Sequence, residues 1–344
     1  MFPATLPTPR TPDPRQAPAL NWGILGTGWI AQRFVDSLHK HSSQRVVAVG
    51  SRTAESAATF AERFGIERAH GSYDELVGDT DVDVVYVATP HNHHHACAML
   101  ALKARKHTLI EKPIALNAGQ AREIAEIAAA QGVFCMEALW TFFLPKFDVI
   151  RQILADGVLG EIRSVDADYG EYFAPGHRIF RQDLAGGPLL DLGTYPIALT
   201  TSVLGAPTAV KAFGTPAPTG VNGQIAAVIE GQNDTLATVH TTLFAFTPST
   251  AVIAGTEGVL TIDGPFMIPG DFHVTAPDGR RLDYTEPAIG HEGLHFQAAA
   301  VARAIADGRT ESALRPLADS IATMSVMDTI RRELGIVFVE EQTS

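Results

Sequence analysis

Apolar residues in the first part of the chain form short continuous runs, separated by segments in which they recur at helical spacing. Such runs are typical of buried parallel strands. They lie at residues 24–25, 45–50, 82–88, 108–110 and 133–136. Thr53 and Asn117 are suited to cap helix N-termini, and Gly65 and Gly132 to end those helices. Strands that alternate with helices predict a doubly wound parallel sheet, and we expect this α/β domain to span residues 21–138.

The pattern changes after residue 137, where longer strands follow one another with few helices between them. A helix is expected to open at Pro145 and to end by Gly157. Pro277-Asp278-Gly279 indicates a hairpin, and two helices at 294–306 and 316–334 close the chain. The expected strands lie at residues 162–173, 209–213, 225–230, 235–246, 251–262 (broken at 255–258) and 280–284. Residues 139–344 are therefore expected to form an α+β domain for substrate binding and dimerisation, with a large, mostly antiparallel open sheet.

Composition excludes several classes of partner. The 344 residues are 46% hydrophobic and 19% charged, with a net charge of −12. An acidic chain without a basic block is a poor binder of nucleic acid or anionic membranes. Two cysteines, Cys97 and Cys135, and the lack of a transmembrane-length apolar run predict a cytoplasmic protein. Residues 1–20 are rich in proline, carry no secretion signal and are expected to be a disordered or loosely draped tail.

A glycine turn joins the first strand to a helix in the sequence W-G-I-L-G-T-G-W-I-A, residues 22–31. Strand, glycine turn and helix in this order are the context of a dinucleotide-binding fingerprint, in which Ala31 is allowed as the third small residue. Gly26 can adopt turn dihedrals, and Gly28 lets the backbone approach a pyrophosphate at the helix N-terminus. A purely steric strand-to-helix connection gives the same pattern. The coenzyme contacts expected here are Gly26, Thr27, Gly28, Trp29 and Ile30.

Two further groups of residues could carry chemistry. Glu111-Lys112-Pro113 places two charges at the end of an apolar strand, and this end of an open parallel sheet faces the ligand crevice. Asp191 and Tyr195 would share one face of a helix, with a kink expected at Pro196. Each group also has a structural interpretation: a solvated loop with a turn proline, and a capping aspartate beside a half-buried tyrosine.

Histidines and aromatic residues add two candidates. Among the histidines at 91–95, only His91 and His95 would share a helix face, and no cysteine or nearby carboxylate completes a metal site, so we expect no metal. Trp140 and the phenylalanines at 142–143 lie at the junction of the two expected domains. Core packing and a substrate-pocket wall are both consistent with that position.

Four motifs occur in a set order: G-T-G-W-I-A, A-T-P-H-N-H-H-H, E-K-P and G-G-P-L-L-D-L-G-T-Y. Together they resemble the glucose-fructose oxidoreductase / inositol dehydrogenase / MocA family over about residues 20–335. Within that family, M-E-A-L-W-T at 136–141 is similar to the dimeric dihydrodiol dehydrogenase branch, whose members oxidise trans-dihydrodiols of arenes and some aldoses. That branch commonly has Arg after this Thr, where the chain has Phe142, and the substrate therefore stays open.

The resemblance implies a Rossmann coenzyme domain and a role for each motif residue. Lys112 would be the catalytic lysine, Tyr195 the general acid/base, and Asp191 a residue that holds substrate or the tyrosine. An ordinary tyrosine, with a pKa of about 10, is a poor base at neutral pH, but a neighbouring ammonium and a positive nicotinamide ring favour its phenolate. Trp140 would join Asp191 and Tyr195 at the substrate. The other coenzyme contacts implied are Thr89, Pro90, His91, His94, Glu111 and Lys112.

The end of the second strand indicates which coenzyme is used. It reads Gly50-Ser51-Arg52-Thr53 and lacks the acidic residue that binds the ribose 2′-hydroxyl of NAD. Arg52 can bind a 2′-phosphate, and Ser51 and Thr53 add neutral donors. NADP is therefore expected, with NAD as the alternative.

The expected function is hydride transfer between NADP and a vicinal diol or a sugar. One alternative is an NADPH-dependent reductase of a ketose, inosose or anhydro-sugar, which runs the same reaction backwards. Another is a non-catalytic dinucleotide-binding regulatory protein, which would not need Lys112, Asp191 and Tyr195 together. A small-molecule substrate is expected in either catalytic case.

The strand expected at 236–246 bears on assembly because it has apolar residues on both faces. One face would carry Ala237, Val239, Leu243 and Ala245, and the other Leu236, Phe244 and Phe246. If closing helices cover one face, the other needs a cover, and a homodimer or higher homo-oligomer by two-fold packing is expected.

Overall fold

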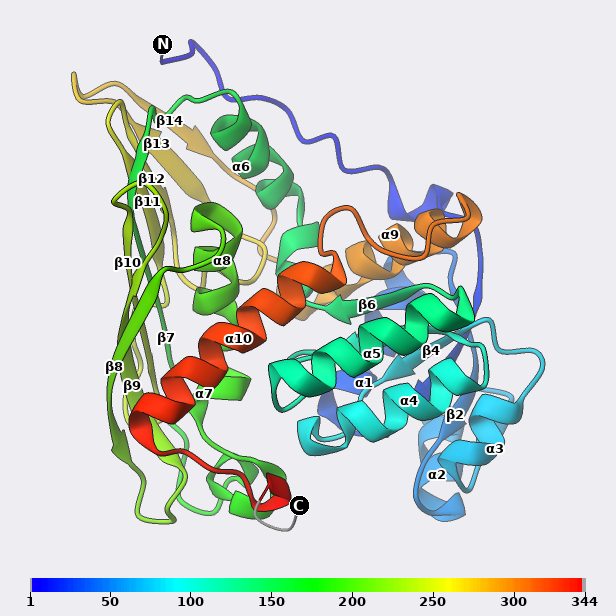
Figure 1. Ribbon diagram of the computed structural model, residues 1–344. Coiled ribbons are helices and arrows are strands. Elements are labelled where there is room, and N and C mark those ends of the chain that lie inside the picture. Colours follow the sequence, from blue (N-terminus) through cyan, green and yellow to red (C-terminus); the bar gives the residue numbers. More distant parts are fainter. Residues whose placement is uncertain (1, 342–344) are drawn as a thin grey trace. The chain divides into compact units, whose positions relative to one another are not determined.

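The computed structural model describes residues 2–341 and divides them into two compact units (Figure 1). The parallel-sheet unit comprises Pro12–Phe143 and Ile289–Ile321. The mixed-sheet unit comprises residues 2–11, Leu144–Ala288 and residues 322–341. Among residues 2–341, no helix is both long and apolar enough to cross a lipid bilayer.

Within residues 2–341, the parallel-sheet unit contains a six-stranded sheet in the order β3-β2-β1-β4-β5-β6, with every neighbouring pair parallel. This doubly wound order confirms the sequence prediction. The sequence pattern does not predict β3, because R-A-H is too short and too polar to form an apolar run. The strands are β1 (Asn21–Leu25), β2 (Arg45–Gly50), β3 (Arg68–His70), β4 (Val84–Val87), β5 (His107–Glu111) and β6 (Cys135–Ala138). The helices are α1 (Trp29–His41), α2 (Ala54–Phe64), α3 (Tyr73–Gly78), α4 (His94–Lys103), α5 (Ala118–Gln131) and α9 (His295–Ala306).

Local capping explains why these helices begin and end where the sequence predicts. The Thr53 hydroxyl accepts a hydrogen bond from the Ser56 amide at 3.2 Å, and the Asn117 side chain accepts one from the Gln120 amide at 2.9 Å. Gly65 and Gly132 end α2 and α5 with φ of 67° and 63°, a left-handed conformation that favours glycine. Helix boundaries in this unit therefore follow from local chemistry.

One long segment belongs to a different unit from the one expected. The sequence predicts that all residues after 138 belong to the second domain, whereas residues 139–143 and Ile289–Ile321 lie in the parallel-sheet unit. The Cys135 amide donates to the Thr310 carbonyl at 3.1 Å, so the returning segment lies beside β6, the edge strand. An edge strand leaves backbone groups unpaired, and the segment satisfies one of them. No local pattern shows which sheet such a segment covers.

Part of the N-terminal tail is packed, so the expectation of a loosely draped tail is wrong for residues 14–20. Pro14–Gln16 form a short 3-10 helix capped by Asp13. Ala17 is buried against Ala299 and Ala302 of α9. The small side chains of α9 leave room for the tail, a complementarity that neither segment reveals alone.

Within residues 2–341, the mixed-sheet unit contains an eight-stranded sheet in the order β14-β13-β12-β11-β7-β10-β9-β8. β7 and β10 are parallel, and the other neighbours are antiparallel, which confirms a large, mostly antiparallel sheet. Helices α7 and α8 pack on β7, β9 and β10. The strands are β7 (Ile162–Gly170), β8 (Ala209–Pro216), β9 (Asn222–Glu230), β10 (Leu236–Thr242), β11 (Ala251–Gly255), β12 (Val259–Ile262), β13 (Phe272–Thr275) and β14 (Arg281–Tyr284). The helices are α6 (Pro145–Ala155), α7 (Pro188–Asp191), α8 (Thr194–Leu204) and α10 (Leu317–Leu334), whose first turn lies in the parallel-sheet unit.

The helix expected to kink at Pro196 is instead two helices, α7 and α8, separated at Leu192-Gly193. Pro196 is the third residue of α8, where its missing N–H removes no intrahelical hydrogen bond. A Cβ on Gly193 would lie 2.6 Å from the Leu189 carbonyl oxygen, so this close turn requires glycine. The break, rather than the proline, sets the path of the chain between Asp191 and Tyr195.

One face of the mixed sheet presents apolar side chains to solvent. Along β10, Ala237 and Val239 are buried while Leu236 is 51% exposed, as the predicted alternation requires. The strand ends at Thr242, earlier than expected, and Ala245 is exposed rather than buried with them. In Figure 1, α6 and α8 lie on the other side of this sheet. The exposed apolar residues in this region are Tyr172, Phe213, Val228, Leu236, Phe244, Phe246 and Val259.

Candidate functional site

The glycine turn after β1 has the geometry of an anion-binding turn. Gly26 has φ of 100°, its amide donates to the Gly50 carbonyl at 2.9 Å, and a Cβ would lie 2.8 Å from the Ala88 oxygen. Gly28 is the N-cap of α1, and a Cβ there would meet no atom of residues 2–341 within 4 Å. The backbone at Gly28 is therefore open to close approach at the N-terminus of α1, the end of a helix that favours a pyrophosphate. Ala31 is fully buried, which explains why only a small residue fits the third position.

The ends of the other parallel strands meet at the same edge of the sheet. Register pairs Leu25 with Gly50 and Val87, and Val87 with Ile110. The segments that follow β1, β2, β4 and β5 therefore lie along one edge, as expected for a doubly wound sheet. This edge brings together the predicted coenzyme contacts of the glycine turn with Ser51, Arg52, Thr53, Thr89, Pro90, His91, His94, Glu111 and Lys112.

At the end of β2, the predicted phosphate-binding residues differ in their surroundings. The Ser51 amide donates to the His70 carbonyl at 3.2 Å, and its side chain is buried. Thr53 uses its hydroxyl as the N-cap of α2. Arg52 is exposed and lies at the carboxyl end of the strand. Of the three, Arg52 is thus the residue with an exposed cationic side chain at this edge.

His94 connects the segment after β4 to the Glu111-Lys112-Pro113 segment. Its Nδ1 lies 2.7 Å from the Pro113 carbonyl oxygen, and its Nε2 lies 2.9 Å from that of Thr89. Burial lowers the pKa of His94 to about 4, so the ring is neutral near pH 7 and donates to one carbonyl at a time. His95 Nε2 lies 2.8 Å from a carboxylate oxygen of Glu123. Within residues 2–341, no three His, Cys, Asp or Glu side chains are grouped as a metal site.

Glu111 is a buried carboxyl directly before the predicted catalytic lysine. It accepts hydrogen bonds from the Tyr86 hydroxyl and, at 3.1 Å, from the Lys112 amide. Burial raises the pKa of Glu111 to about 7, against the lowering effects of Tyr86 and Lys112. The Tyr86 ring stacks on Phe34 of α1 with 4.0 Å between centroids, which fixes the hydroxyl that Glu111 accepts from.

Three rings form a row in the parallel-sheet unit. His291 lies edge-on to Trp29, with centroids 4.8 Å apart, and stacks on Trp140 at 5.5 Å. Burial lowers the pKa of His291, and the charges of Arg33 and Lys112 lower it further, so the ring lies within electrostatic reach of that lysine. Trp140 is buried, and Trp29 is 55% exposed. The sequence pattern does not indicate His291, because it predicts that this segment belongs to the other domain.

Asp191 and Tyr195 both lie close to Tyr169 of β7 in the mixed-sheet unit. The Tyr169 ring of β7 lies 5.9 Å from the Tyr195 ring at 60°. Burial raises the pKa of Tyr169, and Tyr195, Glu171 and Asp191 raise it further. An Arg178 nitrogen lies 3.7 Å from the Asp191 carboxylate. Tyr169 and Arg178 lie outside the motif, so the sequence pattern does not indicate them.

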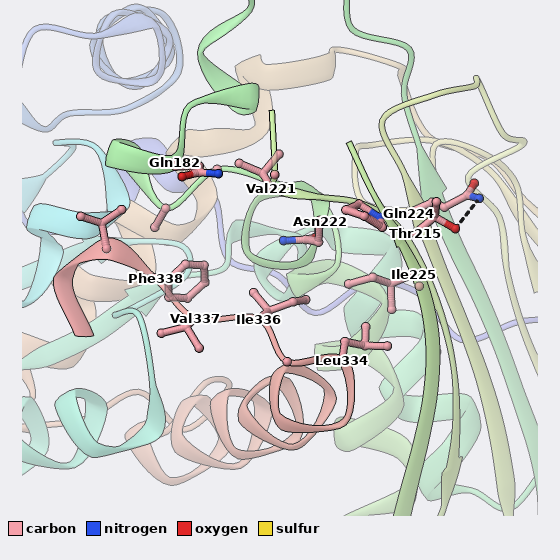
Figure 2. A pocket seen from close by; sticks show the side chains of 17 residues that line it. Gln182, Thr215, Val221, Asn222, Gln224, Ile225, Leu334, Ile336, Val337 and Phe338 are labelled. Atoms are coloured by element: carbon pink, nitrogen blue, oxygen red, sulfur yellow. Dashed lines mark hydrogen bonds between the residues drawn. The ribbon is translucent and has the colours of Figure 1, made fainter. Parts of the chain in front are cut away.

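A cavity of about 390 Å³ also lies in the mixed-sheet unit (Figure 2). Its walls come from residues 182–186, β8, β9 and residues 334–339. Its polar side chains include Gln182, Asn222 and Gln224. Asn222 accepts the Leu189 amide at 3.2 Å and so holds the start of α7. None of the predicted catalytic or coenzyme residues lines this cavity.

The predicted site residues divide between the two units. The coenzyme contacts, Lys112 and Trp140 lie in the parallel-sheet unit, and Asp191 and Tyr195 lie in the mixed-sheet unit.

Comparison with known proteins gives consistent matches. Residues 20–139 match the oxidoreductase family with an NAD-binding Rossmann fold, and residues 147–261 match the GFO/IDH/MocA C-terminal domain. The trans-1,2-dihydrobenzene-1,2-diol dehydrogenase of Bos taurus is 33% identical, over 94% of this chain and 99% of that protein. KijD10, a 3-ketoreductase from Actinomadura kijaniata solved with NADP and TDP-benzene, is 28% identical, with a TM-score of 0.80 over 92% of this chain and 98% of that one. A levoglucosan dehydrogenase solved with NADH and levoglucosan shares the fold, at 22% identity, a TM-score of 0.83 and coverage of 92% and 98%.

Proposed function

We propose, from the premise that this chain belongs to the GFO/IDH/MocA oxidoreductase family, that it is an NADP-dependent dehydrogenase of a vicinal diol or a sugar. The observation that carries this proposal is the single sheet edge at which the open glycine turn, Arg52 and Lys112 meet. A nicotinamide coenzyme supplies the hydride chemistry when it is bound there. The dihydrodiol dehydrogenase relative supports the diol, and the ketoreductase solved with NADP supports the coenzyme.

The proposal assigns one task to each predicted residue. The α1 amides and Gly28 bind the pyrophosphate, and Arg52 binds the 2′-phosphate. Tyr195 takes the hydroxyl proton of the substrate at its phenolic oxygen, and Asp191 orients the substrate or the tyrosine. Lys112 favours the phenolate form of Tyr195 by its positive charge. Trp140, stacked on His291, forms an apolar wall for the substrate ring or chain.

The test of the reaction is a coenzyme assay with a substrate panel. Absorbance of the reduced nicotinamide is followed with NADP or NAD against arene trans-dihydrodiols, aldoses and inositols, and with NADPH against ketoses and inososes. We expect turnover of at least one diol or sugar with NADP. A protein that binds NADP but turns over none of these compounds would instead be the non-catalytic alternative.

Arg52→Ala tests the coenzyme preference. Loss of a charge-assisted hydrogen bond removes about 1.5–3 kcal/mol, so kcat/KM for NADP should fall about 10- to 100-fold. The value for NAD should stay nearly constant, because NAD has no 2′-phosphate. Arg45→Ala, at the opposite end of β2, is the matched control and should change neither value. An unchanged NADP-to-NAD ratio in Arg52→Ala would exclude this role for Arg52.

We also propose that the exposed face of the mixed sheet packs on the same face of a second copy. Phe213 is 82% exposed and Val228 48% exposed on adjacent strands, which is unusual for a face in contact with water only. A two-fold interface matches a patch with itself, so one apolar patch serves both copies.

A further inference from the structure

The loop that carries Lys112 is held by two buried carboxylates on neighbouring strands. Glu111, at the end of β5, accepts the Lys112 amide at 3.1 Å. Glu137, on β6, accepts the Ile114 amide at 3.0 Å through Oε1. The two backbone donors on either side of Pro113 are therefore both fixed by side chains rather than by the sheet.

Glu137 is itself fixed by residues far along the chain. Its Oε2 accepts Arg315 Nε at 3.0 Å, Arg315 Nη2 at 2.7 Å and the Ser320 hydroxyl at 2.7 Å. The side chains of Glu137 and Arg315 are each 1% exposed. Three donors thus converge on one oxygen, which leaves Oε1 directed at Ile114.

This arrangement is a poor choice for stability alone. A buried ion pair loses hydration on both groups, and well-packed apolar residues of similar volume often give equal or greater stability. What an ion pair does supply is fixed geometry, because the planar guanidinium bonds the carboxylate in one orientation. Arg315 Cζ also lies 5.7 Å from the centroid of the Phe142 ring, and this cation–π contact limits the movement of the guanidinium.

We propose that Glu137, held by Arg315 and Ser320, is the positioning residue for the catalytic lysine: it fixes the Ile114 amide and so sets where Lys112 stands at the sheet edge. This inference rests on the proposed function, in which Lys112 acts on Tyr195. Displacements of about 1 Å in a catalytic group reduce turnover as much as 10²-fold, so restraint of this loop has catalytic value.

Glu137→Gln is the central variant because it keeps the shape but has one acceptor oxygen in place of two. The amide cannot accept from both Ile114 and Arg315. Ser320→Ala removes one donor and leaves the ion pair intact, and Ser320→Thr restores a hydroxyl. Amide hydrogen exchange of residues 111–116 without coenzyme reports the restraint itself, and kcat and coenzyme KM report its catalytic effect.

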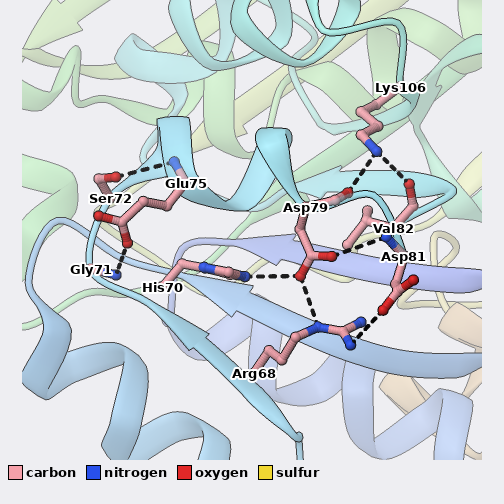
Figure 3. Close-up of polar contacts among 9 residues, drawn as sticks. All are labelled: Arg68, His70, Gly71, Ser72, Glu75, Asp79, Asp81, Val82 and Lys106. Atoms are coloured by element: carbon pink, nitrogen blue, oxygen red, sulfur yellow. Dashed lines mark hydrogen bonds and ion pairs between the residues drawn. The ribbon is translucent and has the colours of Figure 1, made fainter.

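Asp79→Asn is the matched control (Figure 3). Arg68 Nε lies 2.8 Å from the Asp79 carboxylate as an ion pair, and His70 Nε2 is hydrogen-bonded to the same carboxylate at 3.0 Å, in the same unit. Its carbonyl accepts from Lys106, before the start of β5, whereas Lys112 follows the end of that strand. Asp79→Asn therefore removes a paired carboxylate without touching the lysine loop.

In Glu137→Gln, we expect the exchange rates of the amides of residues 112 and 114 to rise about 10-fold or more. We expect kcat to fall about 10-fold or more, and the KM for the coenzyme to change less than threefold. Ser320→Ala should show a smaller change of the same kind, restored by Ser320→Thr, and Asp79→Asn should show neither. Wild-type exchange and kcat in folded Glu137→Gln would overturn the proposal. If Glu137→Gln does not fold, wild-type behaviour of Ser320→Ala would overturn it. A wild-type protein without turnover would refute the proposed function, while the exchange data would still decide the restraint.

Discussion

Burial moves the pKa values of two side chains at the sheet edge in opposite directions, and both shifts favour the neutral form. The pKa of Glu111 is raised to about 7, and that of His94 is lowered to about 4. Both groups contact the segment 112–113. At pH 7 the His94 ring is therefore neutral, and Glu111 carries only part of a full negative charge. A cation beside a partly protonated carboxyl acts more strongly on a bound phenol than one paired with a full carboxylate.

The raised pKa of Glu111 predicts a pH-dependent stability difference between the wild type and Glu111→Gln. The folded protein binds more protons than the unfolded chain between the ordinary value of 4.5 and about 7, so this group's contribution to stability falls as pH rises through that range. The glutamine does not titrate. The wild type should therefore lose about 1–3 kcal/mol relative to the variant between pH 4.5 and pH 8.

Urea unfolding at several pH values measures this difference. Glu55→Gln, on the exposed first turn of α2, is the control and should give a smaller slope. If the difference in the free energy of unfolding between the wild type and Glu111→Gln does not change from pH 4.5 to pH 8, the raised pKa of Glu111 is contradicted.

Tyr195→Phe tests the proton transfer directly. The variant keeps the ring and deletes the hydroxyl, so turnover should fall about 10²-fold or more with little change in NADP affinity. Lys112→Met should also reduce turnover, and the double variant should lose far less than the product of the two effects, because the residues act as a unit. Single-turnover kinetics and coenzyme titration separate the two quantities. Wild-type turnover in Tyr195→Phe would contradict this mechanism but would not bear on the fold.

At the scale of elements, the break between α7 and α8 positions the second half of the site. Asp191 ends α7, and Tyr195 is the second residue of α8, so the angle between the two helices sets the spacing of the two side chains. Gly193 allows that angle because its missing side chain leaves room for the Leu189 carbonyl. Asn222 holds the other end of α7 through the Leu189 amide. The motif glycine therefore affects the site through the geometry of the backbone.

Gly193→Ala should accordingly affect both stability and turnover. A Cβ 2.6 Å from a backbone oxygen forces the turn to move, at about 1–3 kcal/mol, and moves Tyr195 relative to Asp191. The measurements are the unfolding midpoint and kcat at a temperature where the variant is folded. Gly78→Ala, at the end of α3 where the new Cβ meets nothing within 4 Å in the described chain, is the control and should be neutral or slightly stabilising. Wild-type kcat in Gly193→Ala would mean that the turn tolerates a side chain.

At the scale of the whole molecule, the exposed apolar face of the mixed sheet decides the expected assembly. Phe213, Val228 and Leu236 come from β8, β9 and β10 in order across the sheet. The molecular mass in solution tests this expectation, because a single chain has a mass of 36.8 kDa. We expect at least twice this mass by light scattering at micromolar concentration.

Val228→Glu should convert the assembly to monomers, because each interface would bury the new charge in both copies. Val337, an exposed valine outside the sheet, is the matched control, and Val337→Glu should leave the mass unchanged. A monomeric wild type would contradict the proposed two-fold packing, whereas a wild-type mass for Val228→Glu would place the interface elsewhere.

Local chemistry made most of the fold predictable from the sequence, including the sheet edge that carries the proposed coenzyme contacts. Thr53, Asn117, Gly65 and Gly132 delimit helices by hydrogen bonds within four residues or by their own dihedrals. Apolar runs identify buried strands, and a strand, a glycine turn and a helix identify the coenzyme edge. Each of these signals depends only on residues close together in sequence, so it can be recognised without reference to the rest of the chain.

Contacts between distant segments were decided only in the tertiary structure. Arg315 and Glu137 are separated by 178 positions, and neither has a local pattern that marks it as buried and paired. The same holds for His291 beside Trp140, and for Ala17 against α9. The packing of the whole chain determines which apolar faces and edge strands contact one another. A sequence pattern shows that a face is apolar, but it does not show which segment covers that face.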